Sequence, residues 1–288
     1  MSLISVKQWW VASLLVVAIL PANGQNSTGL RAPLVTATGP GNVSRYKVPQ
    51  VRLANAAVSK RINQGILRRV FGSENVDATA AVAQVLQQAT KACCWDAEAR
   101  QWHAGQGLTG CDYQVLLNER GLLSLELIQE FTGAYSYEGT DHLTFDLRTG
   151  KQLTLADVVA DPPAQLQRRM HGAITRRLGE ALRTMETEQL DTADVAFVME
   201  RNSWDKAAKR IRFQSDPGLT NEDRATEPDL ENFALTPQEF RLYYGPVLPH
   251  VVQNLDLDGT YHFPYARVQP RGLLVPVAKA HSAALPKR

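Results

Sequence analysis

The sequence predicts an α+β fold in which an antiparallel sheet meander packs against two or three helices. Some segments repeat apolar residues every four positions, as amphipathic helices do, and others alternate them with polar residues, as half-buried strands do. These segments are grouped along the chain and do not alternate regularly, which favours α+β over α/β. The composition of the 288 residues, 44% hydrophobic and 21% charged, is that of an ordinary globular protein.

Three stretches have helical character. The first lies between 53 and 71, where the four-residue period is set by Val58, Ile62, Ile66 and Val70. An alanine-rich stretch follows from about 78 to 92. The third is predicted to begin after Asp161-Pro162-Pro163, a capping candidate followed by prolines. Its apolar face consists of Leu166, Met170, Ile174, Leu178, Leu182 and Met185.

Alternating apolar residues predict strands in the middle and near the end of the chain. The middle set is a meander over about 113–117, 123–131 and 143–147. Turns at Glu119-Arg120-Gly121 and Arg148–Lys151 join its strands. Two more strands are expected at Phe240–Tyr244 and Tyr261–Tyr265.

Residues 1–24 have the pattern of a cleavable secretory signal. Lys7 precedes an apolar run from Trp9 to Leu20, and the small residues Ala22 and Gly24 suit a cleavage site. The run is shorter than the roughly 20 residues that span a bilayer, although a signal anchor is the alternative. We therefore expect a periplasmic or secreted protein with no stable membrane span after cleavage. The remaining chain would comprise a flexible lead-in over 25–45, a single α+β domain over 46–270 and a C-terminal tail over 271–288.

The nearly equal numbers of basic and acidic residues argue against a strongly basic domain of the kind that binds nucleic acid. With 31 basic and 29 acidic residues, the net charge is +2, so we predict no nucleic-acid partner. Basic residues nevertheless gather on the predicted helix over 161–188, namely Arg168, Arg169, Arg176, Arg177 and Arg183. Such a face is either a solvated helix exterior or a surface that attracts an anionic glycan or membrane.

The three cysteines are disulfide candidates. Cys93 and Cys94 are adjacent, and Cys111 follows in the next predicted segment. Because disulfides persist in exported proteins, we expect either Cys93 or Cys94 to bridge Cys111, leaving the third thiol free or paired between chains. A zinc site is the alternative, but adjacent cysteines lack the spacing of a zinc knuckle and only His103 lies nearby.

Motifs for catalysis, cofactors or metals are weak. Gly105–Gly110 matches GxGxxG, but a strand rather than a helix follows it, so a flexible loop is expected. Asn254–Gly259 matches the start of an EF-hand loop, but Tyr265 stands where a bidentate Glu is needed. Asp141-His142 is an isolated acid–base candidate among scattered histidines. We predict no cofactor and no metal, and a binding protein rather than an enzyme.

Tyrosines near the ends of predicted strands are candidate contact residues. Aromatic residues in strands usually pack against neighbouring strands, but exposed tyrosine beside a glycine corner suits contact with a glycan or a protein. The candidate binding residues are Gly133, Ala134, Tyr135, Tyr137, Tyr243 and Tyr244.

Several segments resemble one family in the order in which they occur. They are Tyr46–Gln50, Phe131–Tyr135, Phe145–Val158, Asn232–Thr236 and Phe263–Tyr265. Over about residues 46–270 the chain resembles the extracytoplasmic domain of unknown function at the C-terminus of the lysozyme-sensing anti-sigma factor. Similar domains accompany the catalytic domain of a peptidoglycan deacetylase. The family often has Gly-Gly-Ala-His where this chain has Gly133-Ala134-Tyr135, so a ligand contact by that histidine does not carry over.

We therefore expect an exported, non-catalytic binding module of the cell envelope. Its partner would be a wall glycan or, as the resemblance implies, a wall-acting protein such as lysozyme. One alternative is an envelope hydrolase acting on wall or sugar-ester substrates, which would need a cleft that gathers His142 and acidic residues. The other is a structural envelope protein whose free cysteine crosslinks chains.

Overall fold

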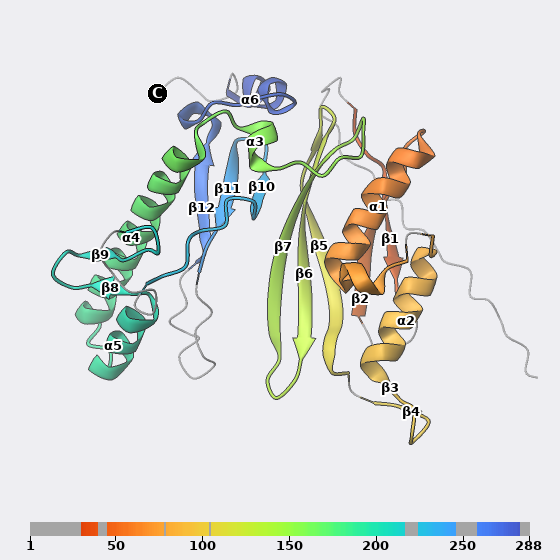
Figure 1. Cartoon of the computed structure of the whole chain (residues 1–288), viewed down its shortest axis with the longest axis horizontal. Coiled ribbons are helices and arrows are strands. Elements are labelled where there is room, and N and C mark those ends of the chain that lie inside the picture. The colour runs from red at the N-terminus through yellow and green to blue at the C-terminus, as the bar shows by residue number, and fades with distance from the viewer. Residues whose placement is uncertain are drawn as a thin grey trace, which may run out of the picture.

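The computed structural model describes residues 30–39, 45–77, 79–103, 105–216, 224–245 and 258–282. Its fold is α+β, as predicted, with two sheets between two groups of helices (Figure 1). The predicted signal over 1–24 lies outside the described residues. None of the helices in the described part of the chain is both long and apolar enough to cross a membrane.

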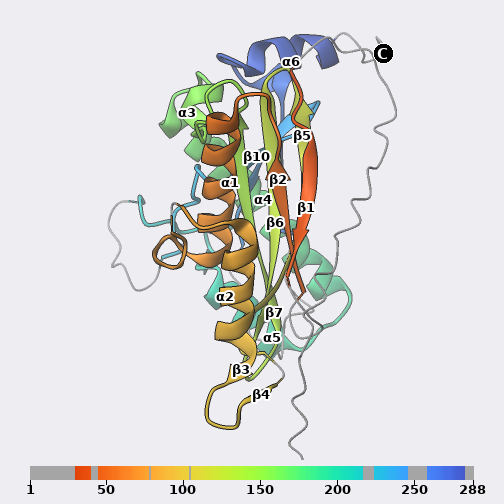
Figure 2. The same ribbon diagram turned by 90° about the vertical axis from the view of Figure 1, so that its right-hand side faces the viewer.

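The first half of the chain builds a five-stranded sheet and two helices. Its elements are β1 (Leu34–Thr38), β2 (Arg45–Val51), α1 (Ala56–Phe71), η1 (Ser73–Asn75), α2 (Val82–Cys94), β3 (Trp95–Asp96), β4 (Gln101–Trp102), β5 (Gly107–Glu119), β6 (Leu122–Thr132) and β7 (Tyr137–Asp146). The strand order is β1-β2-β5-β6-β7, with β2 and β5 parallel and the other neighbours antiparallel. Figure 2 shows α1 and α2 lying together over one face of this sheet.

The second half contributes a smaller antiparallel sheet, ordered β10-β11-β12, and the remaining helices. Its elements are α3 (Leu155–Val158), α4 (Pro163–Thr187), α5 (Thr192–Arg201), β8 (Trp204–Asp205), β9 (Arg210–Ile211), β10 (Phe233–Leu235), β11 (Glu239–Tyr243), β12 (Thr260–Pro264), η4 (Tyr265–Arg267) and α6 (Leu274–Ser282). Helix α4 lies on the outer side of this sheet (Figure 1).

Two hydrophobic cores hold these layers, and both follow from the helical periodicity. The apolar face predicted for 53–71 is buried against Leu123, Leu125 and Leu127 of β6. The face predicted on α4 is buried against β11 and β12, including Phe240 and Phe263. Asn55 caps α1 by accepting hydrogen bonds from the backbone of Ala57 and Val58, which places its start.

Two segments expected to be irregular contain regular structure. Leu34–Thr38, within the predicted lead-in, forms β1 because it pairs along its whole length with β2. Residues 274–282, within the predicted tail, form α6, whose Leu274 and Val277 enter the core shared with α4. His281 of α6 also lies 2.7 Å from the Glu119 carboxylate on β5 (Nε2 to Oε1), so α6 contacts the first half.

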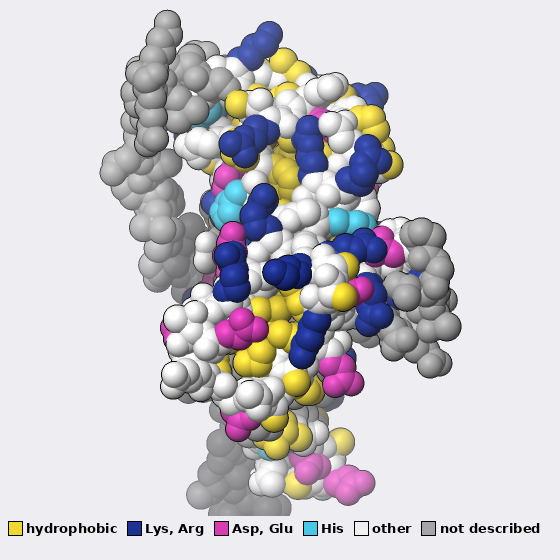
Figure 3. All heavy atoms as spheres, turned by 90° about the vertical axis from the view of Figure 1, so that its left-hand side faces the viewer, with side chains coloured by type: hydrophobic (Ala, Val, Ile, Leu, Met, Phe, Trp, Pro, Cys, Tyr) yellow, Lys and Arg dark blue, Asp and Glu magenta, His cyan; other side chains and the backbone are white. Residues whose placement is uncertain are grey.

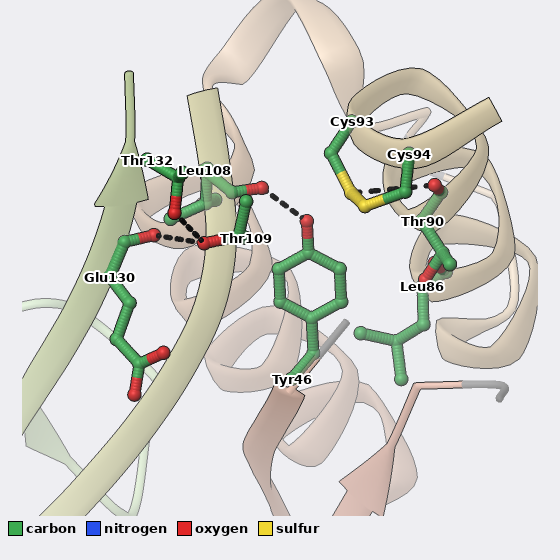
Figure 4. Close-up of a disulfide and its surroundings, with 9 residues drawn as sticks. All are labelled: Tyr46, Leu86, Thr90, Cys93, Cys94, Leu108, Thr109, Glu130 and Thr132. Carbon is green, nitrogen blue, oxygen red and sulfur yellow. Dashed lines mark hydrogen bonds between the residues drawn. A yellow bond between two sulfur atoms is a disulfide. The ribbon is translucent and has the colours of Figure 1, made fainter. Parts of the chain in front are cut away.

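The disulfide differs from the expected bridge. Cys93 is bonded to its neighbour Cys94, and Cys111 is a free thiol that is 1% exposed. The two bonded cysteines end α2, whereas Cys111 is a residue of β5 whose side chain lies in the core. Figure 4 shows Tyr46 between the disulfide and β5, with its hydroxyl donating to the Leu108 carbonyl at 2.5 Å. Burial, with the charge of Asp112 next, raises the pKa of the Cys111 thiol to about 12.

Candidate functional site

The predicted tyrosine site divides into two unlike groups. Tyr135 and Tyr137 are 68% and 55% exposed at the turn between β6 and β7, beside the exposed Gly133 and Ala134. The Tyr137 ring stacks on Phe131 with 4.9 Å between ring centroids. This group is exposed at the surface.

Tyr243 and Tyr244 are instead half-buried packing residues of the second sheet. The Tyr243 ring stacks on His142 at 3.5 Å between centroids, and the Tyr244 ring meets Phe213 edge-on. Burial raises the pKa of Tyr243 to about 12, with the nearby Glu126 charge adding to the shift. The structure therefore does not bring these two residues together with Tyr135 and Tyr137.

His142 belongs to a polar cluster that joins the two sheets. Its side chain is 1% exposed, its Nδ1 lies 2.8 Å from Asn232 Oδ1, and its Nε2 lies 3.0 Å from Glu126 Oε2. The preceding Asp141 is an ion-pair partner of Arg69 on α1 and takes no part in this cluster. Among the hollows found in the described part of the chain, none is lined by His142. His142 is packed between the sheets and contacts one carboxylate and one amide. This arrangement is not the cleft, with His142 and two acids, that the hydrolase alternative requires.

A groove between α4 and β12 is strongly basic. Its volume is about 800 Å³. Five arginines line it against one acid, Glu180: Arg168, Arg169, Arg176, Arg177 and Arg267. Figure 3 shows Lys and Arg side chains, in dark blue, gathered on the face of the molecule that α4 forms.

The groove exists because α4 turns small residues toward β12. Gly172 and Ala173 lie on the face that also carries Arg169 and Arg176, since positions three, four and seven apart share one side of a helix. A Cβ atom added to Gly172 would meet no other atom within 4 Å. On the opposite wall, His262 and Pro264 of β12 point outward, and His262 is held by Glu239 at 2.7 Å (Nδ1 to Oε1).

Two of the groove arginines fasten α4 to the sheet. Arg169 donates to the Arg267 carbonyl at 2.8 Å and lies 3.2 Å from the Asp161 carboxylate. Arg177 lies over the Tyr261 ring, 4.3 Å from its centroid, and donates to the Asp258 carbonyl. The guanidinium groups of Arg169 and Arg177 are therefore engaged in contacts that hold α4 against the sheet.

The other three guanidinium groups remain available to a ligand. Arg168, Arg176 and Arg267 are exposed, and among the described residues no hydrogen bond or ion pair engages their side-chain nitrogens. An arginine fork binds a carboxylate or phosphate through two parallel hydrogen bonds. The groove therefore has the charge and the open donors to hold anionic groups, and the described residues that line it include no cysteine, serine or threonine.

A second hollow of about 540 Å³ continues the basic surface along α4. Arg176 borders both hollows, and the second also has Arg183, Lys206 and Lys209 at its rim. Its floor includes Trp204, which packs beside Gly179 of α4. An extended ligand that entered the groove would meet further positive charge beyond Arg176.

Sequence reasoning identified the arginines of α4 but not the groove. The opposite wall comes from β12 and from Arg267, about 80 residues further along the chain, and no local pattern connects them. Gly172 was the one indication of the groove in the sequence, because glycine in a helix interior lowers helix stability and is usually kept there for packing or function.

The fold and this groove define an α+β protein with an open, basic surface groove. No protein-family model matches the chain, and no curated protein matches it. Among solved structures it is similar to a member of the DUF3298 family from Bacteroides fragilis, with 16% identity, a TM-score of 0.49, and coverage of 88% of this chain and 96% of that chain. A DUF3298 family protein from Pseudomonas aeruginosa has 14% identity, a TM-score of 0.46, and coverage of 84% and 94%. Because both scores are low, we draw no functional conclusion from them.

Proposed function

We propose that this chain is an exported, non-catalytic binding module of the cell envelope that holds an anionic wall glycan in the groove between α4 and β12. The groove carries the proposal, because five arginines and one glutamate line an open hollow in a chain whose net charge is only +2. The signal pattern over 1–24 and the resemblance to an extracytoplasmic domain support the compartment. Carboxylates or phosphates on the glycan would meet Arg168, Arg176 and Arg267.

The spacing of the arginines favours a polymer over a single small anion. Arg169, Arg176 and Arg183 recur every seven residues, which places them about 10.5 Å apart along one side of α4. Both hollows beside this row are open and Arg176 borders each of them, so a chain can pass from one to the other. Because Arg169 is already engaged by Asp161 and the Arg267 carbonyl, successive anionic groups of a polymer would meet the open guanidinium groups of Arg168, Arg176 and Arg267 and then the basic side chains of the second hollow.

A wall-acting protein such as lysozyme is the second candidate partner. The observation that favours it is the exposed pair Tyr135 and Tyr137, since tyrosine is enriched in protein interfaces. The two remaining alternatives, an envelope hydrolase and a structural envelope protein, have less support. His142 is packed between sheets rather than placed in a cleft, and Cys111 is too buried to crosslink folded chains.

The proposal is tested with the chain lacking residues 1–24. Its binding to polygalacturonate, a carboxylate glycan, and to a teichoic acid, a phosphodiester polymer, is measured by calorimetry, with neutral dextran as a control. We expect binding to at least one polyanion that weakens as salt rises, and none to dextran. Immobilised lysozyme is a separate arm, in which the Y135A/Y137A double variant reports on the tyrosine pair.

Charge reversal assigns the binding to the groove. The R168E/R176E variant should lose at least tenfold in affinity, because it replaces two available cations with repelling charges. The matched control is K60E/R68E, which reverses two exposed charges eight residues apart on α1, as Arg168 and Arg176 are on α4. If the wild-type chain binds neither polyanion, or if both variants lose affinity equally, the proposed site is wrong.

A further inference from the structure

Helices α1 and α4 carry the same apolar pattern at an offset of 108 positions. Adding 108 to four of the six buried positions of α1 gives a buried position of α4, whereas Leu67 and Phe71 correspond to the partly buried Thr175 and Gly179. The pairs are Val58 with Leu166, Ile62 with Met170, Ile66 with Ile174, and Val70 with Leu178. Matching apolar faces alone are common among amphipathic helices, so the polar positions decide whether the two helices are related.

The basic positions match at the same offset. Lys60 corresponds to Arg168, and arginine occupies both members of the other three pairs. These are Arg61 with Arg169, Arg68 with Arg176, and Arg69 with Arg177. Four basic residues in one register with four apolar ones are more than amphipathicity requires.

The contacts of these arginines match as well. Arg61 donates to the carbonyl of Thr149, three residues after β7 ends, and Arg169 donates to the carbonyl of Arg267, three residues after β12 ends. Arg69 bonds to the carboxylate of Asp141 within β7, and Arg177 to the carbonyl of Asp258 just before β12. In both halves the first long helix is therefore fastened to the third strand of a meander in the same way.

The short hairpins that follow the second helix are also alike. Trp95-Asp96 begins one and Trp204-Asp205 the other, at an offset of 109 positions. In each, the aspartate accepts hydrogen bonds from the backbone nitrogens two and three residues later, and a basic residue, Arg100 or Lys209, has a positive φ near 50°. Each hairpin then leads to three antiparallel strands, β5–β7 or β10–β12.

We infer that the chain contains two copies of one unit, and that the exchange of Gln64-Gly65 for Gly172-Ala173 opened the groove in the second copy. The unit is a long helix, a second helix, a Trp-Asp hairpin and a three-stranded meander. The part that concerns binding rests on the proposed function of the groove. The part that concerns duplication does not.

The difference between the copies has a physical cause. In the first copy a Cβ on Gly65 would lie 3.2 Å from the ring of Phe145 on β7, so α1 and β7 are in close contact there. In the second copy Ala173 holds that position, and the corresponding ring, Phe263 of β12, borders the groove. The adjacent position is Gln64 in the first copy and the side-chain-free Gly172 in the second. The hollow that Gln64 borders lies on another side of α1, against Gln50 and Val51 at the end of β2.

The binding part is tested by returning the first copy's residues to α4. Gly172→Gln and the double variant G172Q/A173G are titrated with polygalacturonate and teichoic acid, with A164Q as a control that adds glutamine at an exposed position of the same helix. We expect both groove variants to lose at least tenfold in affinity while A164Q binds as the wild type does. Wild-type affinity in both groove variants would overturn this part, whereas a wild-type chain that binds neither polymer would overturn the proposed function.

The duplication is tested without a ligand. Arg61→Ala and Arg169→Ala each remove the hydrogen bond from a first helix to the loop after a third strand. We expect both variants to unfold at lower urea concentration than the wild type, with the larger shift for R169A because it also removes the ion pair with the buried Asp161 carboxylate. Control variants R68A and R176A remove the exposed neighbours at equivalent positions and should leave the midpoint unchanged. A shift of the midpoint in only one of R61A and R169A would contradict the inference that the two halves are equivalent copies.

Discussion

Replacing each of the two interior glycines of α4 by alanine should have a different effect on the free energy of unfolding, because Gly172 lines the open groove and Gly179 packs against Trp204. Alanine is favoured over glycine in a helix interior by about 0.8 to 1.0 kcal/mol. At Gly172 the added methyl group enters open space, so G172A should raise the free energy of unfolding by about 1 kcal/mol. At Gly179 the methyl group would lie 3.2 Å from Cη2 of Trp204, which must shift to accept it. Overpacking costs about 1 to 3 kcal/mol, so G179A should be neutral or destabilising.

Urea unfolding followed by far-ultraviolet circular dichroism measures both changes. The melting temperature of G172A should rise by roughly 2 to 4 °C for a domain of this size. The alanine is also small enough to leave the groove open, so polyanion binding should change little. If G179A stabilises the protein as much as G172A does, the packing of Trp204 against α4 is looser than described and the reasoning fails.

Three further predictions concern buried groups. Burial raises the pKa of Tyr46 and Tyr261 to about 12 from an ordinary value of 10.0, so the folded state keeps protons that the unfolded chain releases. The free energy of unfolding should therefore fall from about pH 10 to pH 12, and urea titrations giving a flat profile there would contradict it. Alkylation in urea without reductant should label Cys111, and label on Cys93 or Cys94 instead would show that the expected bridge to Cys111 forms. Tyr265→Phe removes the hydroxyl that donates to the Thr236 carbonyl at 2.5 Å and should cost about 1 to 2 kcal/mol by the same urea assay.

The local parts of the fold were predictable from the sequence. The apolar faces of α1 and α4 and the meander of β5–β7 follow from spacing within one segment, where the period alone determines what is buried. The strand β1 was not predictable from the sequence, because Leu34–Thr38 has little apolar alternation and owes its conformation to pairing with β2. The vicinal disulfide was not predicted because a bridge from Cys93 or Cys94 to Cys111 was expected from the exported compartment, whereas the fold places Cys111 within β5 with its side chain in the core.

The candidate site was only half predictable for a related reason. The row of arginines on α4 is visible in the sequence, but the groove depends on β12, whose placement beside α4 is a matter of tertiary packing. Exposure was equally hidden, since Tyr137 and Tyr243 both end or begin strands and only one of them is available at the surface. The similarity of the two halves is present in the sequence, but its offset of about 108 residues exceeds the 20–50-residue periods of repeat proteins.

The contact between His281 of α6 and Glu119 of β5 matters for a molecule made of two similar halves. Such a molecule is prone to domain swapping, in which the second half of one chain docks on the first half of another. Helix α6 belongs to the second half by its core contacts, yet its end lies 2.7 Å from a carboxylate of the first. Exchange between molecules would have to break this contact as well as the sheet-to-sheet packing around His142. The C-terminal helix thus adds a second connection between the two halves of the same chain.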